Sequence, residues 1–150
     1  MDYLVKLYEN AFLEIPSEKN SFIVRKPIGP EKGAVIRWIL QNFNEHWASE
    51  AEVAFLKCNS LFIAVEGKKI LGFACYDGTA KGYFGPLGVG DDARGKGVGE
   101  ALVKAALISM SRVGYAYAII PTGKESYYRR FLELIEILGS EPGIYRDMLD

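Results

Sequence analysis

The chain has 150 residues, of which 49% are hydrophobic and 25% are charged, and its formal net charge is -1. This length and composition are typical of one globular domain with its own core, which we expect to span residues 1–150. A near-neutral chain has no overall basic field, so the composition disfavours nucleic acid and anionic lipid and favours a small-molecule partner.

Targeting signals and metal motifs are not evident in the sequence. No apolar run reaches the roughly 18 residues that a membrane span needs. The opening residues "MDYLVKLYEN" alternate charged and apolar side chains, unlike a signal peptide. Cys58 and Cys75 do not have the spacing of a metal site or a disulfide framework. We therefore expect a cytoplasmic protein that binds no metal.

The first half of the chain is predicted to be mostly helical. The spacing of Tyr3, Leu4, Leu7 and Tyr8 predicts a short N-terminal helical extension over about residues 1–19, ended by Ile15–Pro16. A strand follows, and then two helices. Their predicted ranges are Ser21–Ile28 for the strand, from Glu31 for the first helix and Ala48–Leu56 for the second.

The second half alternates strands and helices. Two apolar runs of β type, joined by a tight turn, predict a hairpin, and a third strand extends it although Pro86 prevents a complete hydrogen-bond ladder. These strands cover Leu61–Gly67, Lys69–Gly78 and Gly82–Val89. A helix from Val98, a strand over Gly114–Ile120, a helix over Gly123–Glu133 and a strand over Leu134–Leu138 complete a mixed α/β domain.

The stretch "GVGDDARGKGVGEALVKAAL" places five glycines directly before a predicted helix. A helix N-terminus offers unpaired N–H groups and a positive dipole end, and glycines let the backbone approach an anion closely. This arrangement predicts a phosphate cradle over Asp91–Gly97. A glycine-rich turn without a binding role is the alternative.

Two nucleotide motifs match only in part. "GDDARGKG" fits a P-loop up to its last position, where Gly97 replaces the Ser or Thr that holds Mg²⁺. The dinucleotide fingerprint would need a glycine at Glu100 or Leu102. An ATPase or kinase is therefore only a distant alternative.

The segment "RGKGVG" (Arg94–Gly99), preceded by "PLGV", has the form R-x-x-G-x-G and resembles the acyl-coenzyme A signature of the GNAT N-acetyltransferase superfamily. The order of predicted elements from about Ser21 to Tyr145 is also similar to that family. The resemblance implies a central, mixed, mostly antiparallel sheet flanked by helices. It further implies acetyl-CoA as cosubstrate and a possible homodimer.

The same resemblance implies roles for individual residues. Backbone amides of the loop would bind the pyrophosphate, and the preceding strand would bind the pantetheine arm and supply an oxyanion donor near Val89. The implied cofactor-binding residues are Leu87, Gly88, Val89, Arg94, Gly95, Lys96, Gly97, Val98, Gly99, Glu100 and Tyr128. Pro121 and Thr122 stand where an Asn often contacts the cofactor, which puts that contact in doubt.

A tyrosine commonly protonates the departing thiolate in this family, and "SYYRRF" (Ser126–Phe131) offers two. The resemblance aligns Tyr128 with that general acid, and Tyr127 is the second candidate. The competing interpretation is that both rings only pack in the core. For the general base, Glu50 and Glu52 are the candidates, with Glu45, His46 and Asp77 also open. Trp47, Tyr76, Tyr83 and Phe84 form a possible aromatic wall for the acceptor.

The sequence thus predicts transfer of an acetyl group from acetyl-CoA to a primary amine by direct attack in a ternary complex. The lack of an acidic cluster favours a small amine acceptor over a polycationic one. The main alternative keeps the fold and the coenzyme but lacks turnover, as a CoA-binding sensor or interaction module.

Overall fold

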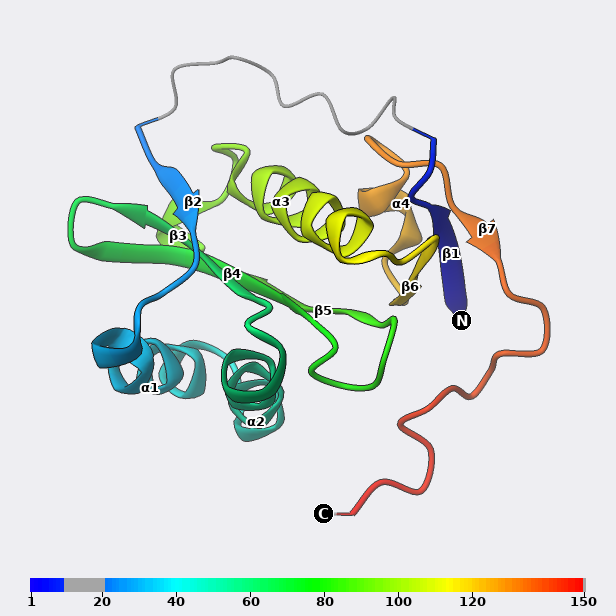
Figure 1. Cartoon of the computed structure of the whole chain (residues 1–150), viewed down its shortest axis with the longest axis horizontal. Helices are drawn as coiled ribbons and strands as arrows, with labels where there is room; N and C mark the ends of the chain where they lie inside the picture. Colours follow the sequence, from blue (N-terminus) through cyan, green and yellow to red (C-terminus); the bar gives the residue numbers. More distant parts are fainter. Residues whose placement is uncertain (10–20, 150) are drawn as a thin grey trace.

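The computed structural model describes residues 1–9 and 21–149. Its helices are α1 (Lys32–Asn42), α2 (Glu45–Val53), α3 (Val98–Val113) and α4 (Glu125–Tyr128) (Figure 1). Its strands are β1 (Asp2–Lys6), β2 (Ile23–Arg25), β3 (Leu61–Glu66), β4 (Lys69–Tyr76), β5 (Phe84–Val89), β6 (Tyr117–Pro121) and β7 (Ile135–Glu136). None of the helices within these ranges combines the length and the apolarity needed to cross a bilayer.

The strands form two antiparallel sheets. One has the order β2-β3-β4-β5 and contains the predicted hairpin and third strand, and the other has the order β6-β1-β7. A single parallel bridge between Tyr83 and Ile119 joins β5 to β6. The prediction of a mixed α/β fold with antiparallel strands flanked by helices is confirmed.

Helices cover both faces of the four-stranded sheet, with α3 on one face and α1 and α2 on the other (Figure 1). The two faces bury separate apolar clusters. On the α3 side these include Leu71, Phe84, Val98, Leu102, Ala106 and Tyr128, and on the other side Val35, Ile39, Ala51, Ile63 and Phe73.

Close packing of α3 on the sheet depends on Gly72. A Cβ at this position would lie 2.8 Å from the carbonyl oxygen of Gly88 and 3.0 Å from the Leu102 side chain. Because Gly72 has no side chain, the start of α3 can approach the middle of β4. The helix N-terminus is thereby held beside the end of β5.

The predicted N-terminal helix is wrong where the structure describes it, because Asp2–Lys6 form strand β1. Tyr3, Val5 and Leu7 are buried in alternation, which is the period of a strand. Strand β1 pairs with β6 along its whole length and with β7 at Tyr3 and Leu4, and this tertiary pairing overrides the helical spacing. The predicted helix end at Ile15–Pro16 lies outside the described residues.

Several element boundaries also differ from those predicted. Helix α2 begins at Glu45 because the Asn44 side chain accepts a hydrogen bond from the Trp47 N–H (2.9 Å), forming an N-cap. Helix α3 ends at Val113 and is followed by Gly114, whose φ of +108° suits a C-cap, so β6 begins only at Tyr117. Helix α4 is a single turn, shorter than the predicted 123–133.

Candidate functional site

Strand β5 has one free edge along most of its length. The Gly90 N–H donates to the Leu71 carbonyl of β4 (2.8 Å), and antiparallel pairing makes successive residues alternate between the two edges. The backbone N–H and C=O groups of Leu87 and Val89 therefore point away from β4. Among the described residues, only the Tyr83–Ile119 bridge pairs this edge.

A bulge in β5 decides which side chains face α3. Tyr76 pairs with Phe84 and Ala74 pairs with Leu87, so β5 contains one residue more than β4 between these pairs. The extra residue places Phe84, Leu87 and Val89 on the face of α3. On the opposite face of the sheet, Gly88 contacts the rings of Phe43 and Phe73. A Cβ built on Gly88 would lie 2.6 Å from Phe43 and 2.7 Å from Phe73.

The glycine loop connects β5 to α3 and lies at the surface. It contains a 3₁₀ turn over Asp91–Ala93, and Gly95 and Gly97 have φ values of +80° and +78°, which favour glycine. Gly97 is the N-cap of α3 and supplies no side-chain cap, so the first N–H groups of this 16-residue helix remain free for a ligand. These features fit the anion cradle predicted from the sequence.

Charged side chains border this loop. Arg94 Nε lies 3.5 Å from a carboxylate oxygen of Asp91, and Lys69 forms an ion pair with Asp92. Arg94 and Lys96 are exposed, and Glu100 pairs with Lys104 (3.2 Å) one turn further along α3. The two positive side chains of the loop therefore face solvent beside the free amides.

Tyr127 contacts the loop, because its hydroxyl oxygen lies 2.1 Å from the position of a Cβ on Gly99. Val89 lies beside the same point at 3.6 Å. Burial raises the pKa of Tyr127, with a smaller lowering effect from Arg130. The phenol of Tyr127 thus stays protonated at neutral pH, where the end of β5 meets the start of α3.

Tyr128 points into the core on the α3 side. Its ring packs edge-on against Phe84 (centroids 6.3 Å apart), and only 8% of the residue is exposed. Burial is the main cause that raises its pKa, and Tyr127 adds to it. The two tyrosines of α4 therefore lie at different heights along β5, Tyr127 at its end and Tyr128 at its start.

The structure separates the carboxylates that the sequence analysis considered. Glu52 pairs with Lys32 of α1 (2.7 Å), whereas Glu50 accepts hydrogen bonds from Thr79 and from the Tyr145 hydroxyl (2.8 Å). Asp77 accepts from the Gly82 N–H and the Tyr115 hydroxyl, so it holds the β4–β5 loop together. Glu45 and His46 are exposed in the first turn of α2.

The proposed aromatic wall is divided between the two faces of the sheet. Trp47 packs with Phe43 on the α1 and α2 side, with ring centroids 5.1 Å apart. Tyr76 is buried and shares a hydrogen bond of 2.7 Å with Ser109 of α3, and Phe84 lies on that face too. Only Tyr83 remains half-buried at the point where β5 and β6 diverge.

Two residues near this point were not considered in the sequence analysis. Asp2 lies on β1 and accepts a hydrogen bond from Tyr83, and Tyr145 reaches Glu50 from the C-terminal segment. Asp2 was missed because the N-terminus was assigned to a helix. The alternation of Tyr3, Val5 and Leu7 was the signal that could have revealed the strand.

The sequence model of the Acetyltransferase (GNAT) family matches residues 33–131. This chain belongs to the GNAT family. The match runs from α1 to the turn after α4, so it includes the free edge of β5, the glycine loop and both tyrosines. A search of curated proteins returned no significant match.

Solved GNAT structures share the fold at low sequence identity. A GCN5-related glucosamine N-acetyltransferase region of a fungal multi-domain GH3 β-N-acetylglucosaminidase has a TM-score of 0.71 and 14% identity, covering 89% of this chain and 19% of that one. A GCN5-related N-acetyltransferase from Sphaerobacter thermophilus has a TM-score of 0.67 and 19% identity, covering 89% and 47%. The chain thus spans less than half the length of these two proteins.

A third GNAT structure contains acetyl-CoA. It is a GNAT family acetyltransferase from Brucella melitensis in complex with acetyl-CoA, with a TM-score of 0.57 and 20% identity, covering 73% of this chain and 80% of that one. At these identities the likeness concerns the fold alone.

Proposed function

We propose that this protein transfers an acetyl group from acetyl-CoA to a primary amine of a small acceptor, both substrates being bound together. The observation that carries the proposal is the continuous surface of free backbone donors formed by the β5 edge and the N-terminus of α3. Such a surface suits a ligand with an extended amide-containing arm and a pyrophosphate.

The residues present fit this cosubstrate. Amides over Arg94–Glu100 would hold the pyrophosphate, since Gly95 and Gly97 adopt the positive φ values of an anion-binding loop. Leu87, Gly88 and Val89 would hold the pantetheine arm through the free backbone groups of Leu87 and Val89, and the N–H of Leu87 is the free donor nearer to the thioester end. Acetyl-CoA itself supplies the activated thioester.

Tyr128 is the proposed general acid. From Val89 to Gly85 the strand spans about 13 Å at roughly 3.3 Å per residue, so an arm that starts at the loop ends beside Phe84. Tyr128 packs against that ring and is kept protonated by burial. Tyr127, which contacts Gly99, would instead line the cosubstrate near the pyrophosphate.

The candidate general bases of the sequence analysis differ in their surroundings. Glu50 lies in a hydrogen-bonded group with Thr79 and Tyr145 on the α2 side, where an acceptor could reach it. Glu52 is paired with Lys32 on the helices. We therefore place Glu50 beside the acceptor and regard Glu52 as the weaker candidate.

A glucosamine N-acetyltransferase region is among the similar folds, so an amino sugar is one reasonable acceptor. The alternative function, a CoA-binding module without turnover, has no observation that favours it, because a protonated tyrosine is present at the expected end of the arm.

The first test is thermal stabilisation of the protein by acetyl-CoA, free CoA and Mg·ATP in parallel. At 100 times the dissociation constant a ligand adds about 2.7 kcal/mol, which raises the Tm of a domain of this size by roughly 5–11 °C. We expect this shift with both CoA ligands and none with Mg·ATP. A shift with Mg·ATP alone would refute the proposal.

A further inference from the structure

A buried carboxylate lies where the two sheets diverge. Asp2 is 7% exposed and is one of only three buried polar or charged residues among those described, the others being Ser60 and Lys104. The Tyr83 hydroxyl donates to Asp2 Oδ2 at 3.1 Å. This hydrogen bond connects the residue directly before β5 to β1 of the other sheet, on the far side of β6.

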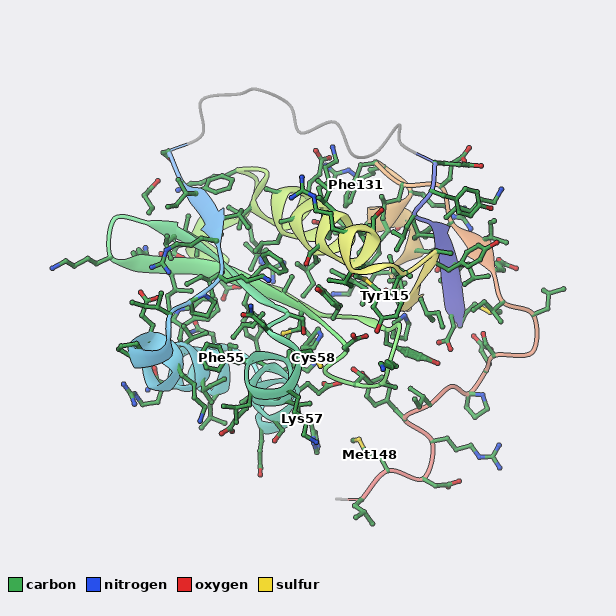
Figure 2. All side chains as sticks on the ribbon, viewed as in Figure 1. Phe55, Lys57, Cys58, Tyr115, Phe131 and Met148 are labelled. Atoms are coloured by element: carbon green, nitrogen blue, oxygen red, sulfur yellow. The ribbon has the colours of Figure 1, made fainter. Side chains whose placement is uncertain are left out.

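The pair lies on the face of the sheet opposite α3. Tyr3 and Phe84 belong to the cluster under α3, so Asp2 and Tyr83, their neighbours along the strands, point to the other face. The same side carries α2 and the C-terminal segment, whose Tyr145 reaches Glu50. Figure 2 shows Cys58, at the end of the α2 region, and Met148, in the C-terminal segment, on this side of the sheet.

The two faces have different chemistry at the divergence of β5 and β6. Tyr128 and helix α4 occupy the face of α3, where the departing sulfur would be protonated. The face of Tyr83 is then the one left for an acceptor amine. The bridge to Ile119 fixes the backbone of Tyr83 at the closed end of the gap between the strands.

We propose that Tyr83 and Asp2 form the relay that accepts the proton of the acceptor amine. In this relay Tyr83 is the catalytic residue that takes the proton of the amine, and Asp2 is a positioning residue that receives the proton through it. This inference rests on the proposed acetyl transfer and assigns its base to Tyr83 and Asp2 in place of Glu50.

The protons balance in the proposed step. As the nitrogen of a neutral amine bonds to the acetyl carbon and the carbon–sulfur bond breaks, the nitrogen gives a proton to the Tyr83 oxygen. The Tyr83 proton passes to Asp2, and the thiolate takes a proton from Tyr128. Solvent then removes the proton from Asp2 and returns one to Tyr128, leaving an amide and free CoA thiol.

The neighbouring charges are compatible with this role. Burial and the hydrogen bond to Asp2 raise the pKa of Tyr83, so Tyr83 is a neutral phenol that can donate and accept at once. Around Asp2, Ser140 Oγ accepts from the Asp2 N–H, and the Met1 ammonium pairs with Glu141 (3.4 Å). On the α2 side, the carboxylate of Glu50 accepts a hydrogen bond from the Tyr145 hydroxyl.

The experiment compares Tyr83→Phe and Asp2→Asn with a matched control, Tyr115→Phe. Tyr115 donates to Asp77 at 2.6 Å, so its loss removes a phenol–carboxylate hydrogen bond of the same kind. Acetyl transfer to glucosamine, tyramine and lysine is measured, together with the acetyl-CoA-induced thermal shift. We expect kcat to fall by about 10²-fold or more in both relay variants, while KM for acetyl-CoA and the thermal shift are unchanged.

An external base separates a proton-transfer role from a structural one. Added imidazole should restore part of the turnover of Tyr83→Phe and should not accelerate the wild type or Tyr115→Phe. Three results would each overturn the relay. They are a wild-type kcat in Tyr83→Phe, an equal loss of kcat in Tyr115→Phe, and a loss of kcat in Tyr83→Phe that imidazole does not restore. A wild type that is inactive on all three amines also overturns it, whereas absence of any acetyl-CoA shift instead refutes the proposed function.

Discussion

Gly99 and Tyr127 meet where α3 begins, and their contact leaves no room for a side chain on the helix. The Tyr127 hydroxyl oxygen would lie 2.1 Å from an alanine Cβ at position 99, and the next ring atom, Cζ, would lie 3.3 Å away. The last glycine of the sequence motif is thus required by the packing of a tyrosine.

We expect Gly99→Ala to destabilise the protein by about 1–3 kcal/mol, as overpacking does. In a Tyr127→Phe background the clashing hydroxyl is absent, so the same substitution should cost much less. Urea unfolding of the four proteins measures the coupling between the two sites, which should exceed about 0.5 kcal/mol. Additive effects would contradict the contact.

At the scale of elements, β1 is the strand that sequence reasoning missed. The apolar residues of β1 fit both the spacing of a helix and the alternation of a strand. Only the pairing with β6 and β7 makes this segment a strand. The Leu7 N–H donates to the Ala116 carbonyl (2.9 Å), so by alternation the Val5 N–H also faces β6, whereas the Lys6 N–H faces the other edge.

Proline substitution tests this register. Val5→Pro should cost about 3 kcal/mol or more, because it removes a ladder donor inside a buried strand. Lys6→Pro is the matched control, since the pairing of β7 with β1 ends at Leu4 and no ladder bond to β7 is lost. Thermal unfolding should separate the two variants, and equal losses of stability would argue against the register.

A second element-level feature is the entry to α1. Glu31 accepts two hydrogen bonds from Arg25 (2.8 and 2.7 Å) and one from the Ile28 N–H (2.8 Å). The Arg25 guanidinium, and next the Ile28 N–H, lower the pKa of Glu31 to about 2. A carboxyl group with a depressed pKa stabilises the fold above its unfolded value and loses that contribution as pH falls through the folded value.

Glu31→Gln should therefore be less stable than the wild type near neutral pH. The difference should shrink as pH falls below about 4.5 and disappear near the folded pKa of about 2. Urea unfolding over this pH range checks the prediction. The double variant Arg25→Gln/Glu31→Gln separates the contribution of the ion pair from that of each side chain alone. A difference that grows in acid would be the wrong sign.

For the whole molecule, the important feature is that two sheets share one bridge and then diverge. Leu87 and Val89 present their N–H groups to the gap, while Gly88 and Gly90 present theirs to β4. In a packed protein, unpaired amides exchange their hydrogens quickly and ladder amides slowly.

Hydrogen exchange by NMR should therefore alternate along β5. Without ligand, the amides of Leu87 and Val89 should exchange much faster than those of Gly88 and Gly90. Acetyl-CoA at saturation should slow the first pair selectively. Uniform protection without ligand would mean that the edge is covered.

The meander, α3 and the glycine loop could be predicted from the sequence because their signals are local: turn residues, apolar periodicity and the R-x-x-G-x-G motif. The placement of Asp2 beside Tyr83 could not, because 81 positions separate them and only the topology joins them. The same limit applies to Tyr145 and Glu50, which are 95 positions apart. The proposed acceptor side of the site consists of such distant pairs.

The central position of β1 also has a consequence for biosynthesis. Its partners, β6 and β7, lie more than a hundred residues later in the chain. During translation, β1 leaves the ribosome before the four strands and α3, and it stays unpaired while they assemble. Its apolar side chains therefore remain exposed until β6 emerges. Closing so long a loop is slow, so completion of the β6-β1-β7 sheet should be the late step of folding.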